Sequence, residues 1–266
     1  MSGFSAEWLA LREPADLRAR DKDVLTSVAT HFADRASLTI VDLACGTGAT
    51  QRALAPHILC RQNWVMVDNN LSLLARAGAG QTQPGCTMRT IPIDLVRDLE
   101  HALDGGPDLI VTSALLDLVS AEWLDRLVLE CAVRKLPLYA ALTYDGRITC
   151  EPGDSFDGAV VNALNRHQLR DKGFGPALGP TALAALRESL KAAGYIMHEG
   201  TSDWVVSSNE RALQQATLAG FAKAAHEMGD LSTQDVAGWL QRRLALVGGG
   251  RASLRVGHGD VFAHPA

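Results

Sequence analysis

The sequence feature that constrains this chain most is an apolar run followed by a glycine turn and a helical pattern. It spans residues 40–50, IVDLACGTGAT, where Asp42 closes the apolar run and Gly46 and Gly48 flank the turn. Glycine lets the backbone approach a ligand closely, and the start of a helix offers free amide N–H groups. Strand, glycine turn and helix in this order predict a cradle for a nucleotide-like ligand.

The strand-then-helix pattern repeats along the first half of the chain. Strands are expected at 38–43, 64–68, 86–91, 109–112 and 136–143, with helical patterns between them. Apolar strands that alternate with helices are typical of a parallel sheet covered on both faces, which is a doubly wound α/β fold. Ligands of such sheets bind outside the carboxyl ends of the strands. These ends carry Asp42, Asp68, Asp94, Ser113 and Tyr144.

The alternation stops at the turn Asp145-Gly146, which is expected to end the fifth strand. Residues 144–180 are rich in glycine and proline and predict an insertion that sets substrate specificity. A helix at 181–193, a strand at 195–200, helices at 209–228 and 233–247 and a final edge strand at 252–262 follow. The last two helices are expected to pack on the sheet or on a neighbouring subunit, which leaves a homodimer open.

The N-terminal segment predicts two helical pieces split at Pro14, because proline is tolerated in the first turn of a helix. A surface helix packed on the core is the simpler interpretation. The alternative is a lid in which Trp8 covers a ligand and an arginine grips a carboxylate. In that interpretation Arg12 serves the substrate and Arg20 the cofactor. The chain then divides, within a single domain 1–266, into a helical lid 1–34, a cofactor-binding core 35–143, the insertion 144–180 and C-terminal strands and helices 181–266.

Composition and charge narrow the class of protein. The 266 residues include 47% hydrophobic and 21% charged residues, which is ordinary for a soluble globular protein. A net charge of −5 disfavours nucleic acid and anionic membranes as partners. Five scattered cysteines without a C-x-x-C pair argue against a disulfide framework and a zinc knuckle. No signal-peptide core or membrane-spanning apolar run is present, so a cytoplasmic protein is expected.

The glycine turn differs from the dinucleotide fingerprint G-x-G-x-x-G. Gln51 stands where the third glycine would let helix and strand pack closely under a pyrophosphate. Asp42 precedes the turn, where its charge repels a pyrophosphate and attracts an ammonium group. Both features disfavour NAD and favour a cation such as S-adenosylmethionine, which has a sulfonium and an α-amino group.

Four sequence motifs, in matching order and spacing, resemble those of the class I S-adenosylmethionine-dependent methyltransferase family. Residues 41–48 resemble its first motif, Val67-Asp68 its ribose-binding acid, Ile93-Asp94-Leu95 its adenine-binding pair, and 108–113 its fourth strand. The resemblance covers roughly residues 37–143. It implies a seven-stranded, mostly parallel Rossmann-like methyltransferase sheet, with the N-terminal lid and the insertion after the fifth strand as additions. It also implies S-adenosylmethionine as cofactor, bound by Arg20, Asp42, Ala44, Gly46, Gly48, Asp68, Asn69, Asp94, Leu95 and Ser113.

The segment after the fourth strand, 112–117, lacks the Asn/Asp-Pro-Pro-aromatic tetrad of base and glutamine N-methyltransferases. The cysteine pair of cytosine-C5 or radical methyl transfer is also missing. With the charge balance, this favours methyl transfer to an O or N atom of a small-molecule metabolite. A non-methylating reaction on the same fold and a non-catalytic partner subunit are the alternatives, and an RNA methyltransferase is less favoured.

A protonated hydroxyl or amine acceptor requires a base, and His167 is the best candidate. It lies in a polar cluster, 165–174, whose simpler interpretation is a solvated helix face. Tyr144 and Asp145, at a strand end, either face the cofactor methyl or form a β-turn.

Other polar residues of the second half suit the substrate. Asp117 interrupts an apolar run, as a helix cap or as a substrate partner, and Asp171 and Lys172 are assigned to the substrate from the same polar cluster as His167. Trp204 is expected in the core. The other histidines are isolated, so no metal site is expected.

Overall fold

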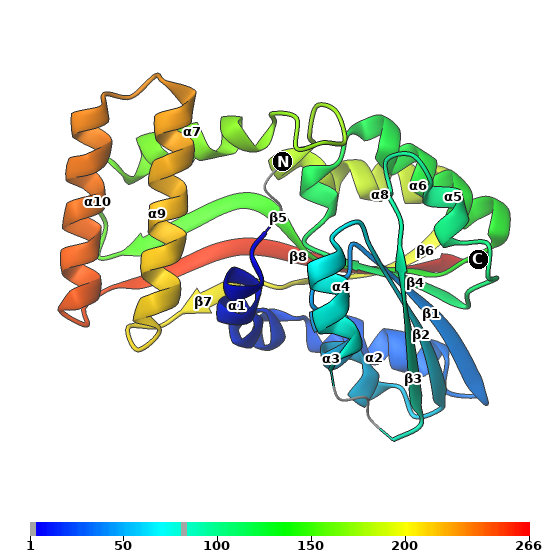
Figure 1. Cartoon of the computed structure of the whole chain (residues 1–266). Helices are drawn as coiled ribbons and strands as arrows, with labels where there is room; N and C mark the ends of the chain where they lie inside the picture. The colour runs from blue at the N-terminus through cyan, green and yellow to red at the C-terminus, as the bar shows by residue number, and fades with distance from the viewer. Residues whose placement is uncertain (1–3, 81–83) are drawn as a thin grey trace.

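The computed structural model describes residues 4–80 and 84–266, and a single sheet forms its centre (Figure 1). The strand order is β3-β2-β1-β4-β5-β8-β6, and β7 pairs with β8. Neighbouring strands from β3 to β5 are parallel, whereas β8 is antiparallel to β5, β6 and β7. The doubly wound, mostly parallel sheet is thus confirmed. The strands are β1 (Ser37–Leu43), β2 (Arg61–Asp68), β3 (Cys86–Pro92), β4 (Leu109–Ser113), β5 (Leu138–Glu151), β6 (Tyr195–Thr201), β7 (Trp204–Val206) and β8 (Ser253–Pro265).

Helices cover both faces of the sheet because alternate strand residues point to opposite sides. Val65 and Val67 join the apolar cluster of α5, α6 and α8, whereas Trp64 and Met66 join that of α2, α3 and α4. The buried residues 64–67 of β2 are therefore apolar on both faces. The helices of these two layers are α2 (Lys22–His31), α3 (Ala49–Leu54), α4 (Leu71–Gly78), α5 (Leu99–Ala102), α6 (Ala121–Arg134) and α8 (Ala182–Ala192).

Strands β5 and β8 continue beyond the parallel strands as a ribbon, and β7 joins it by pairing with β8 (Figure 1). Three helices, α7 (Asp157–Gln168), α9 (Arg211–Met228) and α10 (Thr233–Gly248), pack on it and are called the helical cap below. Ribbon and cap share an apolar cluster separate from the two described above. The apolar faces of α9 and α10 are therefore used inside the chain. No described helix is long and apolar enough to span a bilayer.

The N-terminal prediction of a break at Pro14 is wrong. Helix α1 (Ala6–Ala19) continues through the proline, and α2 starts after Asp21, whose carboxylate accepts the N–H groups at its N-terminus. A proline inside a helix removes one backbone hydrogen bond. Here Arg12 and Asp16, one turn apart on either side of Pro14, form a buried ion pair that ties the two turns together.

Two predictions about the second half of the sheet are also wrong. Asp145-Gly146 does not end the fifth strand, because shifts in register on both sides of Tyr144 let β5 run on to Glu151. Gly146 has a φ of 89°, and a Cβ there would lie 2.9 Å from Pro180 Cβ, so only glycine fits the bend. The last strand, β8, is not an edge strand, since it lies between β5 and β6.

Candidate functional site

The loop between β1 and α3 is tied to the end of β2 by hydrogen bonds. The Asp68 carboxylate accepts the Gly46 N–H at 2.9 Å through Oδ2 and the Asn70 N–H at 2.8 Å through Oδ1. Gly46 and Gly48 have φ angles of 55° and 84°, in the left-handed region that favours glycine. Asp68, predicted to hold a ribose, therefore also fixes the glycine loop.

Asp42, which precedes this loop in the sequence, has a fully buried side chain. Neither of its carboxylate oxygens has a hydrogen-bond partner among the described residues. Burial raises the pKa of Asp42 to about 8, and the charge of Arg20 opposes the rise. A buried carboxylate without a partner costs free energy, so such a group calls for an explanation. A bound cation would supply one.

Arg20, between α1 and α2, reaches the carboxyl end of β4. Its Nη2 donates to Ser113 Oγ at 3.2 Å and its Nη1 to the Tyr139 hydroxyl at 3.2 Å. The buried Nε has no hydrogen-bond partner within the described chain. Because Arg20 also acts on the pKa of Asp42, the structure brings three predicted cofactor residues, Arg20, Asp42 and Ser113, to one place.

The remaining predicted cofactor residues follow the ends of β1, β2 and β3. Ala44 has a positive φ of 55°, and Asn69 is exposed in the turn after β2. Asp94 Oδ1 accepts the Val96 N–H at 3.0 Å, and Leu95 is buried in the core. All four lie along the same edge of the sheet as the glycine loop.

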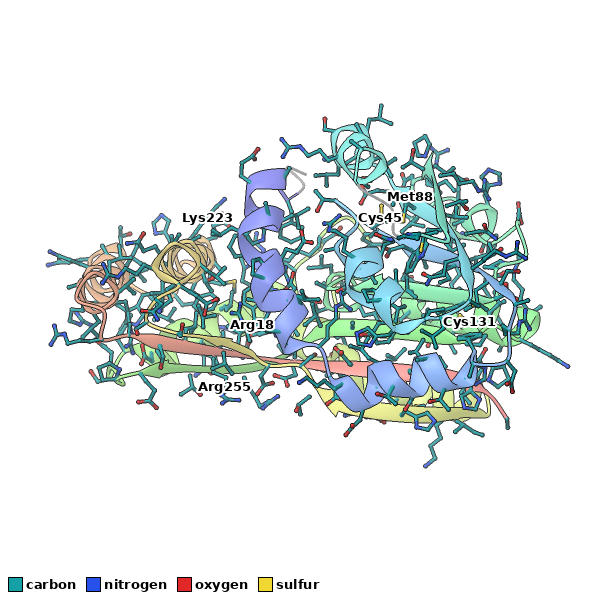
Figure 2. The ribbon with its side chains drawn as sticks, turned by 90° about the horizontal axis from the view of Figure 1, so that it is seen from below. Arg18, Cys45, Met88, Cys131, Lys223 and Arg255 are labelled. Carbon is teal, nitrogen blue, oxygen red and sulfur yellow. The ribbon has the colours of Figure 1, made fainter. Side chains whose placement is uncertain are left out.

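Helix α1 lies directly over the glycine loop. Figure 2 shows it standing between α9 and α10 on one side and α3 and α4 on the other. A Cβ on Gly46 would lie 3.2 Å from Leu9 Cδ1. Arg52 donates to the Glu13 carboxylate at 2.5 and 2.8 Å and to the Thr47 carbonyl at 2.7 Å. A small pocket of about 20 Å³, roughly the room of one water, lies between α1 and α3 beside Arg20 and Arg52.

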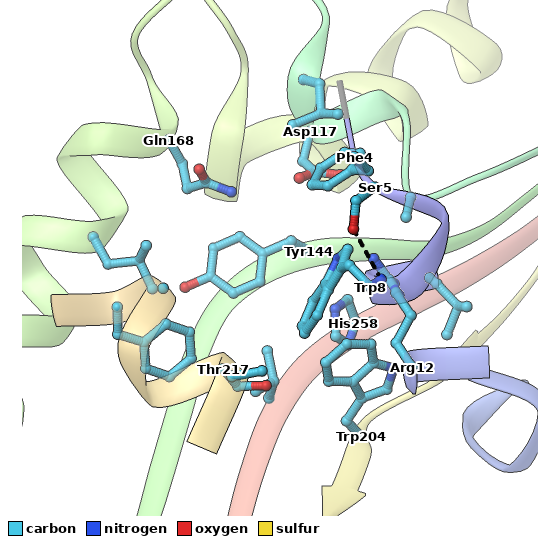
Figure 3. A pocket seen from close by; sticks show the side chains of 18 residues that line it. Phe4, Ser5, Trp8, Arg12, Asp117, Tyr144, Gln168, Trp204, Thr217 and His258 are labelled. Atoms are coloured by element: carbon cyan, nitrogen blue, oxygen red, sulfur yellow. Dashed lines mark hydrogen bonds between the residues drawn. The ribbon is translucent and has the colours of Figure 1, made fainter. Parts of the chain in front are cut away.

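A much larger cavity, of about 450 Å³, is lined by Trp8 and Arg12 of α1 (Figure 3). It is bounded by α1, the segment after β4, the β5–β8 ribbon with β7, and the cap helices α7 and α9. This volume is typical of a small-molecule pocket. Most of its walls are apolar, and its polar lining includes Arg12, Asp117, Tyr144, Gln168, Thr217 and His258.

Arg12 is held in the cavity wall by Asp16 and Trp204. Its Nε and Nη2 donate to the Asp16 carboxylate at 2.9 and 3.0 Å. The indole Nε1 of Trp204 donates to the same carboxylate at 2.8 Å, and the guanidinium stacks 4.6 Å from the Trp204 ring centre. Asp16 thus fixes both side chains and balances the charge of Arg12.

Aromatic rings continue this wall. The ring centres of Trp8 and Trp204 are 6.3 Å apart, those of Trp204 and His258 5.4 Å, and those of His258 and Tyr144 6.1 Å. Burial and the nearby charge of Arg12 lower the pKa of His258 to about 3, so its imidazole is neutral near pH 7. The Tyr144 hydroxyl donates to Asn165 Oδ1 at 2.6 Å.

Asp117 provides a carboxylate to the cavity from the short 3₁₀ turn Leu116–Leu118 after β4. It is 6% exposed, and its buried Oδ1 has no hydrogen-bond partner in the described structure. Burial raises the pKa of Asp117 to about 6. The expected alternative role as a helix cap belongs to Ser120, whose Oγ accepts the Trp123 N–H at 3.2 Å.

Backbone strain gathers at the same cavity. Ala114 and Leu142, which both line it, have positive φ angles of 52° and 53°. Such conformations of residues other than glycine cost free energy and cluster at functional sites. Ala114 follows Ser113, the partner of Arg20, so the segment after β4 links the cavity to the cofactor residues.

Four predicted site residues do not line the cavity. His167 Nε2 lies 2.8 Å from Glu227 Oε2, and Lys172 Nζ lies 3.2 Å from His167 Nδ1. Asp145 accepts from Arg147 Nε at 2.8 Å, and Asp171 accepts the N–H of the glycine at position 173 at 2.6 Å. The α7 residues that do line the cavity are Leu164 and Gln168, one turn apart, because neighbouring residues on a helix face different directions.

The sequence reasoning did not assign Asp16 and His258 to the site, and it placed Trp204 in the core. Trp204 is indeed buried, at 4% exposure, yet it also lines the cavity. A usable signal existed for His258, because Gly257-His258-Gly259-Asp260 interrupts an apolar strand with buried polar groups. Asp16 carries no such signal, since a single acid on a helix is usually solvated.

Comparison with known proteins tests the fold. No protein-family model and no curated protein sequence matches the chain. A cyclopropane-fatty-acyl-phospholipid synthase-like protein from Lactobacillus casei ATCC 334 superposes with a TM-score of 0.52 at 16% identity, covering 98% of this chain and 94% of that one. The chain has a Rossmann-like methyltransferase fold.

Two further solved structures agree. A mycolic acid cyclopropane synthase complexed with SAH and CTAB has a TM-score of 0.50 at 12% identity, covering 90% of this chain and 82% of that one. A putative methyltransferase from Bacillus halodurans C-125 has a TM-score of 0.50 at 14% identity, covering 92% and 100%. The matched stretches cover nearly the whole of this chain.

Proposed function

We propose that the protein is an S-adenosylmethionine-dependent methyltransferase that methylates an O or N atom of a small molecule held in the cavity. The observation that carries the proposal is the buried, uncompensated carboxylate of Asp42 below a glycine loop that Asp68 holds in place. The fold supports it, since one synthase of this fold was crystallised with SAH.

The residues at the loop suit the charges and hydroxyls of this cofactor. Asp42 matches its cationic groups, and Arg20, with a free buried Nε, matches its carboxylate. Asp68 offers two carboxylate oxygens at the end of β2, where they suit a ribose, and Asp94 with Leu95 suits an adenine. Leu9 lies close to Gly46 and Glu13 pairs with Arg52, so these two α1 side chains border the proposed cofactor site.

When bound, the cofactor supplies a methyl group already activated by its sulfonium. The protein then has to position the acceptor and exclude water. Holding two reactants in line is worth roughly 7–11 kcal/mol of the barrier. The apolar cavity next to Ala114 is suited to this task, because it adjoins Ser113 and Arg20 on the cofactor side.

A mass-spectrometric screen tests the proposal. The protein and S-adenosylmethionine are added to a metabolite extract, and we expect S-adenosylhomocysteine together with one compound that gains a methyl group. The Asp68→Ala variant should form neither. Cofactor consumption without any methylated compound would contradict methyl transfer and favour a non-methylating reaction, and no consumption at all would contradict the enzymatic assignment.

A further inference from the structure

Two charged side chains line the cavity, and only one of them has its charge balanced. Arg12 is paired through two hydrogen bonds with Asp16, and Asp16 lies behind it with both oxygens engaged. Asp117 forms no ion pair among the described residues, and its buried Oδ1 has no hydrogen-bond partner there. Of the other titratable lining groups, His258 is neutral, and burial raises the pKa of the Tyr144 phenol. The cavity therefore has a net negative character at Asp117.

The walls suit the body of an organic cation. Trp8, Trp204, His258 and Tyr144 form a continuous row of rings, each centre within 6.3 Å of the next. Aromatic faces attract ammonium groups and pack against apolar rings or chains. Phe221 from α9 adds a further aromatic side chain to the lining.

We propose that the cavity binds a small amine with an aromatic or apolar body, its ammonium beside Asp117 and its body along the row of rings. An acid is disfavoured, because its carboxylate would meet an Arg12 that is already neutralised and an Asp117 of like charge. The position of Asp117 directly after β4 places the amine nitrogen toward the cofactor residues Ser113 and Arg20.

The identity of the methyl acceptor rests on the proposed function, whereas amine binding does not. In the transfer, the ammonium first gives one proton to Asp117, from which it passes to solvent. The nitrogen lone pair then forms the N–C bond while the C–S electron pair stays on sulfur. The product is a methylated ammonium, and one proton is released for each methyl group transferred.

Calorimetric titration of the whole protein at pH 7.5 tests the binding site. The probes are tryptamine and 2-phenylethylamine, their neutral counterparts tryptophol and 2-phenylethanol, and the acid indole-3-propionate. We expect at least one amine to bind about 10-fold or more tightly than its alcohol, and the acid to bind more weakly than both, since a charge-assisted hydrogen bond distinguishes them.

Two variants sharpen the result. Asp117→Asn keeps the shape of the side chain and should weaken amine binding by about 10- to 100-fold while alcohol binding changes less than about 3-fold. Asp104→Asn removes a carboxylate that is 61% exposed and outside the cavity, so it controls for the loss of overall charge and should leave both unchanged. Retained alcohol binding shows that Asp117→Asn is folded.

The proposal is overturned if neither amine is preferred over its alcohol, if the acid binds best, or if the amine preference survives in Asp117→Asn. S-adenosylmethionine binding, titrated on the same samples, separates this outcome from failure of the proposed function. Cofactor binding without amine preference would overturn the amine site alone. Amine preference without cofactor binding would overturn the methyltransferase alone.

Discussion

The glycine loop and the cavity both border α1 but are built in opposite ways. The loop site draws on residues 42–113, which follow one another along β1 to β4, with Arg20 as the one contribution from outside. The cavity collects side chains from α1, the segment after β4, α7, α9 and the ribbon, between positions 4 and 258. The residues of the loop site follow one another in consecutive sequence motifs. The residues of the cavity are far apart in the sequence and come together only in the folded chain.

The two sites nevertheless share one feature, a buried carboxylate. Each contains a buried carboxylate with unsatisfied oxygen, both atoms of Asp42 at the loop and Oδ1 of Asp117 in the cavity, among the described residues, and burial raises the pKa of both. A fold retains such groups at a cost in stability. Two uncompensated carboxylates are what a reaction between a sulfonium donor and an amine acceptor would need. The predictions below test this parallel.

Asp42 is expected to show the largest effect, on stability. Its pKa is raised from 3.8 to about 8 in the folded state, so its penalty is absent below pH 4, grows as the pH rises from about 4 to about 8, and is fully present above that. Between these values the protein loses up to about 1.36 kcal/mol per pH unit through this group. Asp42→Asn removes the loss. Its unfolding temperature without ligand should exceed that of the wild type, by more at pH 8 than at pH 5.

Urea denaturation at the two pH values checks this expectation. An equal gain at both pH values would show that Asp42 is not buried as a raised-pKa carboxylate. The variant should at the same time bind S-adenosylmethionine more weakly, because the group that destabilises the empty protein is the one that binds the cation.

Asp16→Asn is expected to have the next largest effect, and it should act mainly on the cavity. It leaves the charge of Arg12 unbalanced and weakens the link to Trp204. Amine affinity should fall by about 10-fold and the affinity for indole-3-propionate should rise by a similar factor, while cofactor affinity stays the same. A titration in which the acid gains nothing would indicate that Asp16 does not set the charge of the cavity.

His167→Ala should have the smallest effect. The sequence pattern made His167 the best candidate base, but the structure pairs it with Glu227 outside the cavity. Turnover of the methylated compound found in the screen should change less than about 3-fold. A loss of 100-fold or more, which is the usual contribution of a general base, would return His167 to the mechanism.

The fold was predictable from the sequence only where the pattern is local. Parallel strands from β1 to β4 were predictable because each is a short apolar run that ends in a polar residue at the same edge of the sheet. The course of α1 through Pro14 was not, because the sequence does not show that the Arg12–Asp16 pair that spans it is buried against Trp204. The central position of β8 was hidden because glycines and buried polar groups interrupt its apolar pattern.

The candidate site divides in the same way. Asp42, Asp68 and Ser113 were predictable because their spacing follows the strand ends. The role of Trp204 and His258 in the cavity was not, because it depends on how β7 and β8 pair and on which face of the ribbon the cap covers. The sequence left two roles open for Asp117, a helix cap or a substrate partner. Because Ser120 caps the helix, the structure favours the role of Asp117 in the cavity.

The central claim is that the glycine loop binds S-adenosylmethionine while the cavity binds the acceptor. Calorimetric titration of S-adenosylmethionine into the wild type, Asp68→Ala and Asp117→Asn tests it most directly, with circular dichroism as a check that the loop variant is folded. We predict binding to the wild type, a loss of about 100-fold in Asp68→Ala, and a change of less than about 3-fold in Asp117→Asn. Unchanged affinity in a folded Asp68→Ala protein would contradict the account.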